Sequence, residues 1–217
     1  MRNKLITLSG LDSAGKSTQI EKLESYFLSN NIKVKVIWSR GGYTPLFNVL
    51  KYILRKITPN KLPEPGESKD RDEIFSKKWI RVLWLDIAIV DLMIFYGLYF
   101  RLLNLWGYTI IADRFLHDTY VDWRLGFKNE NFEKTILWKM LVYLSPKPRL
   151  SFLLTISVEE AVRRSKLKNE PFSENLSRRE ERRDLYLELI DKGRWKYIID
   201  GLDAPDEVMA SIKSKLK

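Results

Sequence analysis

The sequence contains no cysteine and only one histidine, His117, among its 217 residues. Without cysteine the chain has no disulfide framework, no thiolate metal site and no cysteine nucleophile. This composition fits a reducing compartment, and we expect a cytoplasmic protein. Met1 leads within a few residues into an apolar run at 5–8, which leaves no room for a signal peptide.

The charge balance is basic, because 38 lysines and arginines face 28 acidic residues and give a net charge of +10. The 45% hydrophobic and 30% charged fractions are typical of a soluble globular chain, and the length fits one domain. A basic excess fits nucleic acid, an anionic lipid surface or a phosphorylated small substrate. Much of the excess lies in residues 163–183, where glutamates are mixed in and interleaved aromatic residues are lacking, so nucleic-acid binding is disfavoured.

The strongest motif is GLDSAGKS at residues 10–17, which fits the phosphate-binding pattern G-x-x-x-x-G-K-[ST] in full. An apolar run precedes it and residues at helical spacing follow, so strand, glycine loop and helix come in the expected order. Gly10 and Gly15 let the backbone approach a phosphate closely, and the free amides cradle the anion. Lys16 would reach the β- and γ-phosphates, and the Ser17 hydroxyl would bind Mg²⁺. The alternative is a glycine turn that binds nothing.

We therefore expect ATP and Mg²⁺ as cofactors. The nucleotide-binding residues would be Gly10, Asp12, Ser13, Ala14, Gly15, Lys16, Ser17 and Thr18.

Apolar runs alternate with helical patterns along the rest of the chain. We expect strands at 5–8, 33–38, 108–112, 150–156 and 195–200, with helices at 18–28, 45–57, 79–106, 121–145 (broken near 126–131), 184–191 and from 205 onward. A further helix begins after Ser157, its expected N-cap, and turns residues 158, 161 and 162 inward. Such alternation implies an α/β fold, a phosphate-loop (P-loop) three-layer sandwich whose five-stranded parallel sheet carries helices on both faces. Residues 58–78 are polar and rich in proline, and are either a mobile insertion or a lid.

Loops at the carboxyl ends of parallel strands line the ligand crevice of such a sheet. Arg40 follows the second expected strand and stands beside two glycines, so it is either an anion contact or a solvated residue of a plain turn. Asp113 and Arg114 follow the third strand in the same way.

The stretch 79–106 is the most apolar of the chain and is long enough to span a membrane. Asp86, Asp91 and Arg101 interrupt it, and an aspartate in mid-membrane costs about 2.5–3.5 kcal/mol. We therefore expect no transmembrane span but a long core helix whose two aspartates face a cleft. A peripheral membrane contact through its exposed aromatic residues stays open.

Several motifs together resemble thymidylate kinases. Residues 10–18 look like the phosphate loop of that family, 39–46 (SRGGYTPL) are similar to its R-E-P-G-G-T-P-L segment, and 113–115 match its D-R-[YF] motif. Residues 177–180 (SRRE) are similar to the D-R-F-E after its lid, and the stretch from 197 to 208 is like its last strand and helix. The resemblance covers the whole chain and implies one kinase domain, 1–217, with a lid near 163–183.

The resemblance also implies roles for individual residues. Arg40 and Arg114 would hold the phosphate of the acceptor, Asp113 would support Mg²⁺ through water, and Asp12 would lie near the acceptor sugar. The family carries its catalytic arginine in the phosphate loop or in the lid. Ser13 stands at that place in the loop, so the lid would supply the residue. The candidates there are Arg164, Lys166, Lys168 and Arg178.

The acceptor side departs from the family pattern. The helix at 79–106 lacks the arginine that reads thymine, and residues 116–123 (LHDTYVDW) replace a serine and an A-Y-Q segment. An acceptor phosphate is already anionic and needs no strong base. If the acceptor were an alcohol, His117 or Asp118 would be the first candidates for the base, and Asp86 and Asp91 weaker ones. His117 is otherwise a structural hydrogen-bonding residue.

These observations favour a kinase that transfers a phosphoryl group from ATP to a small phosphorylated acceptor, a nucleoside monophosphate such as dTMP or a relative. Its catalytic residues would include Lys16 and Arg114. The residues expected around the acceptor are Asp12, Arg40, Asp86, Asp91, Arg114 and His117. The alternatives are a nucleotide-binding protein with little transfer activity and, with less support, a nucleic-acid binder. The resemblance further implies a homodimer formed through the apolar helix.

Overall fold

The computed structural model describes residues 4–39, 44, 47–49, 52, 56, 75–168 and 174–216. Arg40, most of the helix expected at 45–57, most of the insertion at 58–78 and residues 169–173 of the expected lid lie outside the described residues.

The core of the fold is a five-stranded sheet in which every neighbouring pair of strands is parallel. Its strands are β1 (Leu5–Gly10), β2 (Val34–Trp38), β3 (Thr109–Asp113), β4 (Leu150–Thr155) and β5 (Tyr197–Asp200). They lie in the order β2-β3-β1-β4-β5. The first strand therefore occupies the centre, which places the phosphate loop that follows it in the middle of one sheet edge.

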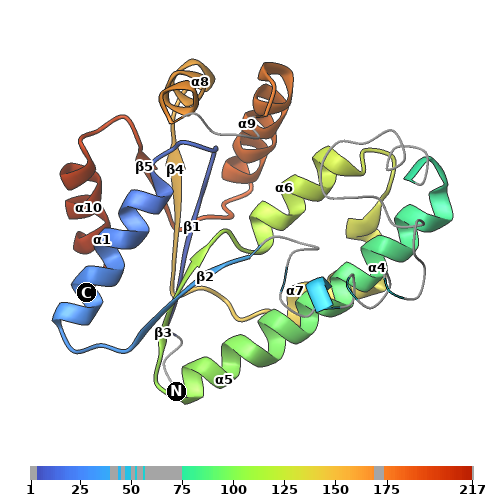
Figure 1. The fold of residues 1–217 in the computed structure, drawn as a ribbon, viewed down its shortest axis with the longest axis horizontal. Coiled ribbons are helices and arrows are strands. Elements are labelled where there is room, and N and C mark those ends of the chain that lie inside the picture. The colour runs from blue at the N-terminus through green and yellow to red at the C-terminus, as the bar shows by residue number, and fades with distance from the viewer. Residues whose placement is uncertain are drawn as a thin grey trace.

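Helices cover both faces of this sheet, which confirms the predicted three-layer fold class (Figure 1). The α-helices are α1 (Lys16–Ser29), α4 (Lys78–Ile94), α5 (Phe100–Leu105), α6 (Leu116–Gly126), α7 (Ile136–Leu144), α8 (Val158–Leu167), α9 (Leu176–Asp191) and α10 (Pro205–Ser214). A π-helical turn, Phe95–Tyr99, joins α4 to α5, and a 3₁₀ turn, Phe132–Lys134, precedes α7. In Figure 1, α1 and α10 pack together on one side of the strands, and α4, α5 and α6 lie on the other.

Two of the expected helices begin at least five residues earlier than predicted. α6 begins at Leu116 instead of residue 121. α9 begins at Leu176, eight residues before the expected start, and the Asn175 side chain caps it by accepting a hydrogen bond from the Arg178 amide (2.9 Å). Its first two turns bury arginines rather than apolar residues, so a search for apolar spacing overlooks them. α8 runs from Val158 to Leu167 and has Ser157 as its N-cap, as its sequence indicates.

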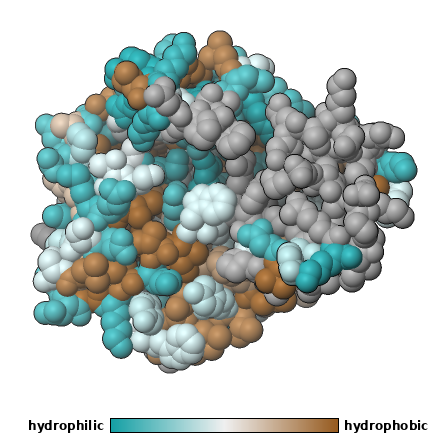
Figure 2. Space-filling view, in the orientation of Figure 1, coloured by the Kyte–Doolittle hydropathy of each residue, from teal (hydrophilic) through white to brown (hydrophobic). Residues whose placement is uncertain are grey.

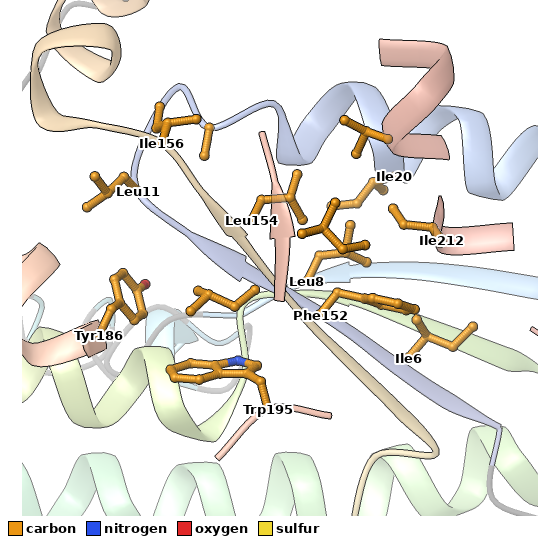
Figure 3. Close-up of a cluster of buried hydrophobic side chains, with 14 of the residues drawn as sticks. Ile6, Leu8, Leu11, Ile20, Phe152, Leu154, Ile156, Tyr186, Trp195 and Ile212 are labelled. Atoms are coloured by element: carbon orange, nitrogen blue, oxygen red, sulfur yellow. The ribbon is translucent and has the colours of Figure 1, made fainter. Parts of the chain in front are cut away.

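Apolar side chains fill the space between the sheet and the helices in two clusters. In the first, Leu8 of β1 and Phe152 of β4 are fully buried and lie among side chains from α1, α9 and α10 (Figure 3). The second joins β3 to the inner side of α4 and α5, with Ile89, Leu92 and Tyr96 fully buried. The two clusters pack the helices onto the strands, and the loops at the carboxyl ends of the strands extend from this packed core.

The segment from Lys78 to Leu105 is one continuous helix of 28 residues, and by length and composition it is long enough and apolar enough to cross a membrane. One side of it belongs to the core, and a third of its most apolar window is buried inside the protein. The other side exposes apolar residues, among them Val90, Ile94 and Leu98. In Figure 2, apolar and aromatic side chains gather along the lower edge, where Figure 1 shows α5.

Candidate active site

Three loops meet at the carboxyl edge of the sheet because of the register of the central strands. Asp113 at the end of β3 is paired with Leu8 of β1 and with Trp38 of β2, and Gly10 is paired with Leu154 of β4. The phosphate loop, the segment after β2 and the Asp113-Arg114 pair therefore share one edge, which is where ligands bind in open α/β sheets.

The phosphate loop has a backbone that glycine makes accessible at two points. Gly10 has φ 143° and Gly15 has φ 91°, and Ser13 between them also has a positive φ, 65°. A Cβ on Gly10 would lie 2.4 Å from the carbonyl oxygen of Leu154, so only glycine fits there. Gly15 has no side chain with which to cap α1. The first amides of this helix are therefore open to an anion, as a phosphate cradle requires.

Lys16 is 93% buried and folds back onto the loop, where its Nζ donates to the carbonyl oxygens of Gly10 (3.0 Å) and Leu11 (2.7 Å). Burial, followed by the nearby positive charge of Arg114, lowers the pKa of Lys16 to about 8. A polyphosphate in the loop would stabilise the charged ammonium and replace the two carbonyls as its partner.

Asp113 fits the expected role near a metal ion. Within the described part of the chain, its Oδ1 is buried without a hydrogen-bond partner, and burial raises the pKa of the carboxyl group. Ser17 stands exposed in the first turn of α1. No group of three or more His, Cys, Asp or Glu with metal-site geometry occurs among the described residues. Mg²⁺ needs no such group, since it keeps several waters and takes one or two protein ligands beside the phosphates of its nucleotide.

Arg114 is a buried guanidinium at the same edge, 6% exposed, and contacts the Asp12 carboxylate through Nη2. Its Nη1 is buried and has no hydrogen-bond partner among the described residues. Burial alone would lower the pKa of Arg114, but Tyr186, Asp12, Asp122 and Asp118 raise it above its usual value, so the group stays charged. A buried cation with a spare donor, next to a phosphate loop, can bind an oxyanion.

The two aspartates of the apolar helix face different directions. Asp91 is 5% exposed, and the Thr44 hydroxyl lies 2.6 and 2.5 Å from its two oxygens, so it anchors Thr44. Asp86 instead lines a surface hollow of about 620 Å³ with Lys78, Trp79, Val82 and Leu83. The expectation that both aspartates face one cleft is therefore wrong, because five residues of helix rotate a side chain by about 140°.

The candidate lid arginines take different positions. Arg164 of α8 donates to Glu160 (2.6 Å) and to the carbonyl of Gly201 (2.9 Å), which lies against the Ala14 backbone of the phosphate loop. Arg178 of α9 is 44% exposed and lies 3.5 Å from Glu174. Lys166 and Lys168 are exposed near the end of α8.

His117 lies in a packing position. Its ring is 5.3 Å from that of Trp195, which precedes β5 at the opposite end of the sheet from the phosphate loop. Burial lowers its pKa. The structure therefore separates His117 from the other expected acceptor residues and supports the structural interpretation.

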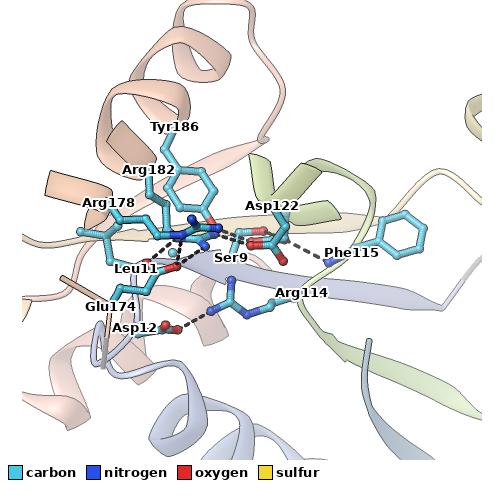
Figure 4. Close-up of polar contacts among 12 residues, drawn as sticks. Ser9, Leu11, Asp12, Arg114, Phe115, Asp122, Glu174, Arg178, Arg182 and Tyr186 are labelled. Atoms are coloured by element: carbon cyan, nitrogen blue, oxygen red, sulfur yellow. Dashed lines mark hydrogen bonds and ion pairs between the residues drawn. The ribbon is translucent and has the colours of Figure 1, made fainter. Parts of the chain in front are cut away.

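Sequence reasoning missed a buried polar cluster between α6 and α9 (Figure 4). Arg182 is 1% exposed and donates to Asp122 (2.6 Å) and, through two nitrogens, to Glu174 (2.9 and 2.6 Å). Tyr186, one turn later, donates to Asp118 (2.7 Å). The sequence does carry a signal for this cluster. Two aspartates stand four residues apart on α6, and their hydrogen-bond donors, an arginine and a tyrosine, stand four residues apart on α9. Asp118 already accepts several hydrogen bonds, so it does not serve as a free base.

The central phosphate loop, the parallel sheet and the cationic edge together define a nucleotide kinase-like protein. No protein-family model matches the chain. The chain is nevertheless a distant full-length homologue of thymidylate kinases from several species. It is 27% identical to the thymidylate kinase of Thermosipho melanesiensis over 212 residues, which cover 96% of this chain and 94% of that protein. It is 29% identical to the thymidylate kinase of Chlorobium limicola over 231 residues, which cover 98% of this chain and 94% of that protein. It is 24% identical to the thymidylate kinase of Prochlorococcus marinus over 235 residues, which cover 100% of this chain and 97% of that protein.

Proposed function

We propose that this protein is an ATP- and Mg²⁺-dependent kinase that transfers the γ-phosphoryl group of ATP to a nucleoside monophosphate, dTMP or a related acceptor, in the cytoplasm. The observation that carries the proposal is a pair of buried cations at one sheet edge. Lys16 donates to the phosphate loop, while the Nη1 of Arg114 has no hydrogen-bond partner among the described residues. The two lie close enough for the charge of Arg114 to lower the pKa of Lys16.

In this mechanism the chain positions two phosphates and stabilises the charge that develops between them. The amides at the start of α1 and Lys16 hold the donor phosphates. Ser17 and, through water, Asp113 would hold Mg²⁺, which neutralises phosphate charge when bound. Arg114 orients the acceptor phosphate, and Asp12 both fixes Arg114 and lies near the acceptor. Residues 163–183 act as a lid that brings Arg164 or Arg178 to the transferred group.

The decisive experiment is ADP release from ATP in the presence of a panel of nucleoside monophosphates. We expect one of them to stimulate ADP release, and Lys16→Ala to reduce the stimulated rate by about 10²–10³-fold, as for loss of one charge-stabilising donor. Lys22→Ala is the matched control, since Lys22 lies on the same helix and pairs with Asp206 on the surface. Equal losses in both variants would contradict the role of Lys16.

The second candidate is a nucleotide-binding protein with little turnover. Its support is the departure of residues 116–123 from the thymidylate kinase pattern, since Asp118 and Asp122 in this stretch form hydrogen bonds within the protein. ATP binding without stimulation by any nucleoside monophosphate or sugar phosphate would favour this candidate over the kinase.

We also propose that two copies associate through the exposed side of the apolar helix, with Val90, Ile94 and Leu98 at the contact. These side chains are 42%, 45% and 56% exposed, and apolar area removed from water contributes roughly 25 cal/mol per Å². We expect light scattering after gel filtration to report a dimer for the native chain and a monomer for Ile94→Arg. Leu28→Arg, a change at an exposed site on α1, should remain dimeric. A monomeric native chain that sediments with anionic vesicles would instead support peripheral membrane contact.

A further inference from the structure

Arg114 occupies a strained backbone conformation. Its φ is +70°, in the left-handed region that residues other than glycine rarely adopt. Such a residue costs about 1–3 kcal/mol and persists only where its surroundings fix it. Here the Arg114 amide donates to the carbonyl of Leu8 (3.0 Å), and its own carbonyl accepts from the Ser39 hydroxyl (3.1 Å). These bonds hold the peptides on both sides of Arg114, and the N–H of the second peptide, which belongs to Phe115, needs a partner of its own.

Asp118 supplies that partner. Its Oδ2 accepts the backbone N–H of Phe115, the residue after Arg114, at 3.0 Å. The same oxygen accepts the hydroxyl of Ser9 at 2.6 Å, and Ser9 directly precedes the phosphate loop. The carboxylate is 1% exposed, so water does not compete for these bonds. One side chain thus ties the peptide after Arg114 to the end of β1.

The other oxygen of Asp118 reaches the far side of the cluster. Its Oδ1 accepts the hydroxyl of Tyr186 at 2.7 Å, and Tyr186 lies on α9, the helix that follows the expected lid (Figure 4). Burial, followed by the negative charge of Asp118, raises the pKa of Tyr186 well above its usual value, so the phenol keeps its proton and remains a donor. The carboxylate therefore joins three segments that are far apart in the chain.

We propose that Asp118 is a positioning residue that holds Arg114 in its left-handed conformation and links it, through Tyr186, to α9. The inference rests on the proposed function in that Arg114 is taken to bind the acceptor phosphate. Asp118 touches no reacting atom in this assignment. It fixes the direction in which the spare nitrogen of Arg114 points, and it transmits the position of α9 to the acceptor site.

The test compares Asp118→Asn with Asp122→Asn. Both substitutions remove one buried negative charge from α6, one turn apart, and both charges act on Arg114. Only the first changes the acceptor of the Phe115 amide and of the Ser9 hydroxyl. The first measurement is the ¹⁵N–¹H resonance of the Arg114 Nε, identified by its loss in Arg114→Lys. We expect Asp118→Asn to shift this resonance and speed its hydrogen exchange, and Asp122→Asn to leave its exchange rate unchanged.

Kinetics give the second measurement. We expect Asp118→Asn to raise the KM for the acceptor about tenfold, with the affinity for ATP unchanged, as for loss of one hydrogen bond to a charged group. A role in stability alone would lower the melting temperature and leave this KM in place. Tyr186→Phe, which removes one hydroxyl without changing shape, should produce a smaller shift of the Arg114 resonance and serves if Asp118→Asn fails to fold.

An Arg114 resonance with native position and exchange in Asp118→Asn, or in Tyr186→Phe where that variant alone folds, would overturn the proposal. The resonance needs no acceptor, so it decides the proposal even if every nucleoside monophosphate fails as substrate. Failure of the acceptor panel with a shifted resonance would therefore contradict the proposed function and leave the role of Asp118 supported.

Discussion

Arg182→Met should lower the free energy of unfolding by about 3–5 kcal/mol, the cost of removing one partner from a buried ion pair. The Arg182 side chain is 1% exposed and pairs with Asp122, whose side chain is 6% exposed, and with Glu174 at 14%. Methionine fills similar space but removes the guanidinium that neutralises these two carboxylates, and Glu174 keeps the more distant Arg178 (3.5 Å). Urea denaturation followed by tryptophan fluorescence measures the change.

Arg183→Met is the matched control, because the neighbouring arginine pairs with Asp184 at the surface and its side chain is 42% exposed. Surface ion pairs contribute little, so this variant should unfold near the native midpoint. The combined change Asp122→Asn, Glu174→Gln and Arg182→Met should recover much of the lost stability, because it removes the uncompensated charges together. Equal midpoints for Arg182→Met and Arg183→Met would show that the buried cluster does not stabilise the fold.

The same cluster has a consequence for the expected lid. Glu174 is the first described residue after 169–173, and Arg182 donates to it through Nε and Nη2 and to Asp122 of α6 through Nη1. Arg179 adds a hydrogen bond from Nε to the Glu174 carbonyl (3.0 Å) and one from Nη2 to Ser165 of α8 (2.9 Å). The part of the expected lid from Glu174 onward is thus anchored to α6 and α8, and Arg178 lies within this anchored part.

The sequence was sufficient to predict the phosphate loop, the parallel sheet and the edge residues Asp113 and Arg114, because each depends on local pattern. A glycine loop between a strand and a helix has few alternatives, and parallel strands bring their carboxyl ends to one edge. The homology with thymidylate kinases over the full chain agrees with those motifs. The identity of the acceptor cannot be predicted in this way, since it depends on side chains that several helices and loops bring together.

The cluster of Asp118, Asp122, Arg182 and Tyr186 could not be predicted from apolar periodicity. Its partners on α6 and α9 are 60 to 68 residues apart, and α9 buries arginines where a pattern search looks for leucines. Charged residues in a basic run are usually solvated, but Arg182 is buried because two carboxylates and a tyrosine surround its position. His117 shows the reverse, since a lone histidine that attracts attention in the sequence packs against Trp195.

Gly10→Ala should weaken ATP binding by about a hundredfold, equivalent to about 2.7 kcal/mol. The added Cβ would lie 2.4 Å from the carbonyl oxygen of Leu154, and because this is a backbone atom no flexible side chain can yield. β4 cannot retreat without breaking its pairing with β1, so the loop must shift and its amides no longer converge on one phosphate. Isothermal titration calorimetry with ATP and Mg²⁺ measures the loss.

Gly193→Ala separates the strain of a positive φ from the geometry of the loop. Gly193 has φ +64° and no heavy atom within 4 Å of its would-be Cβ, and it lies in the turn between α9 and β5. Its substitution should cost about 1–2 kcal/mol of stability and leave the affinity for ATP unchanged. Equal affinities in Gly10→Ala and Gly193→Ala would mean that the loop tolerates a side chain at its first glycine. The phosphate would then be held mainly by Lys16 and the start of α1, because those groups do not depend on the contact between Gly10 and Leu154.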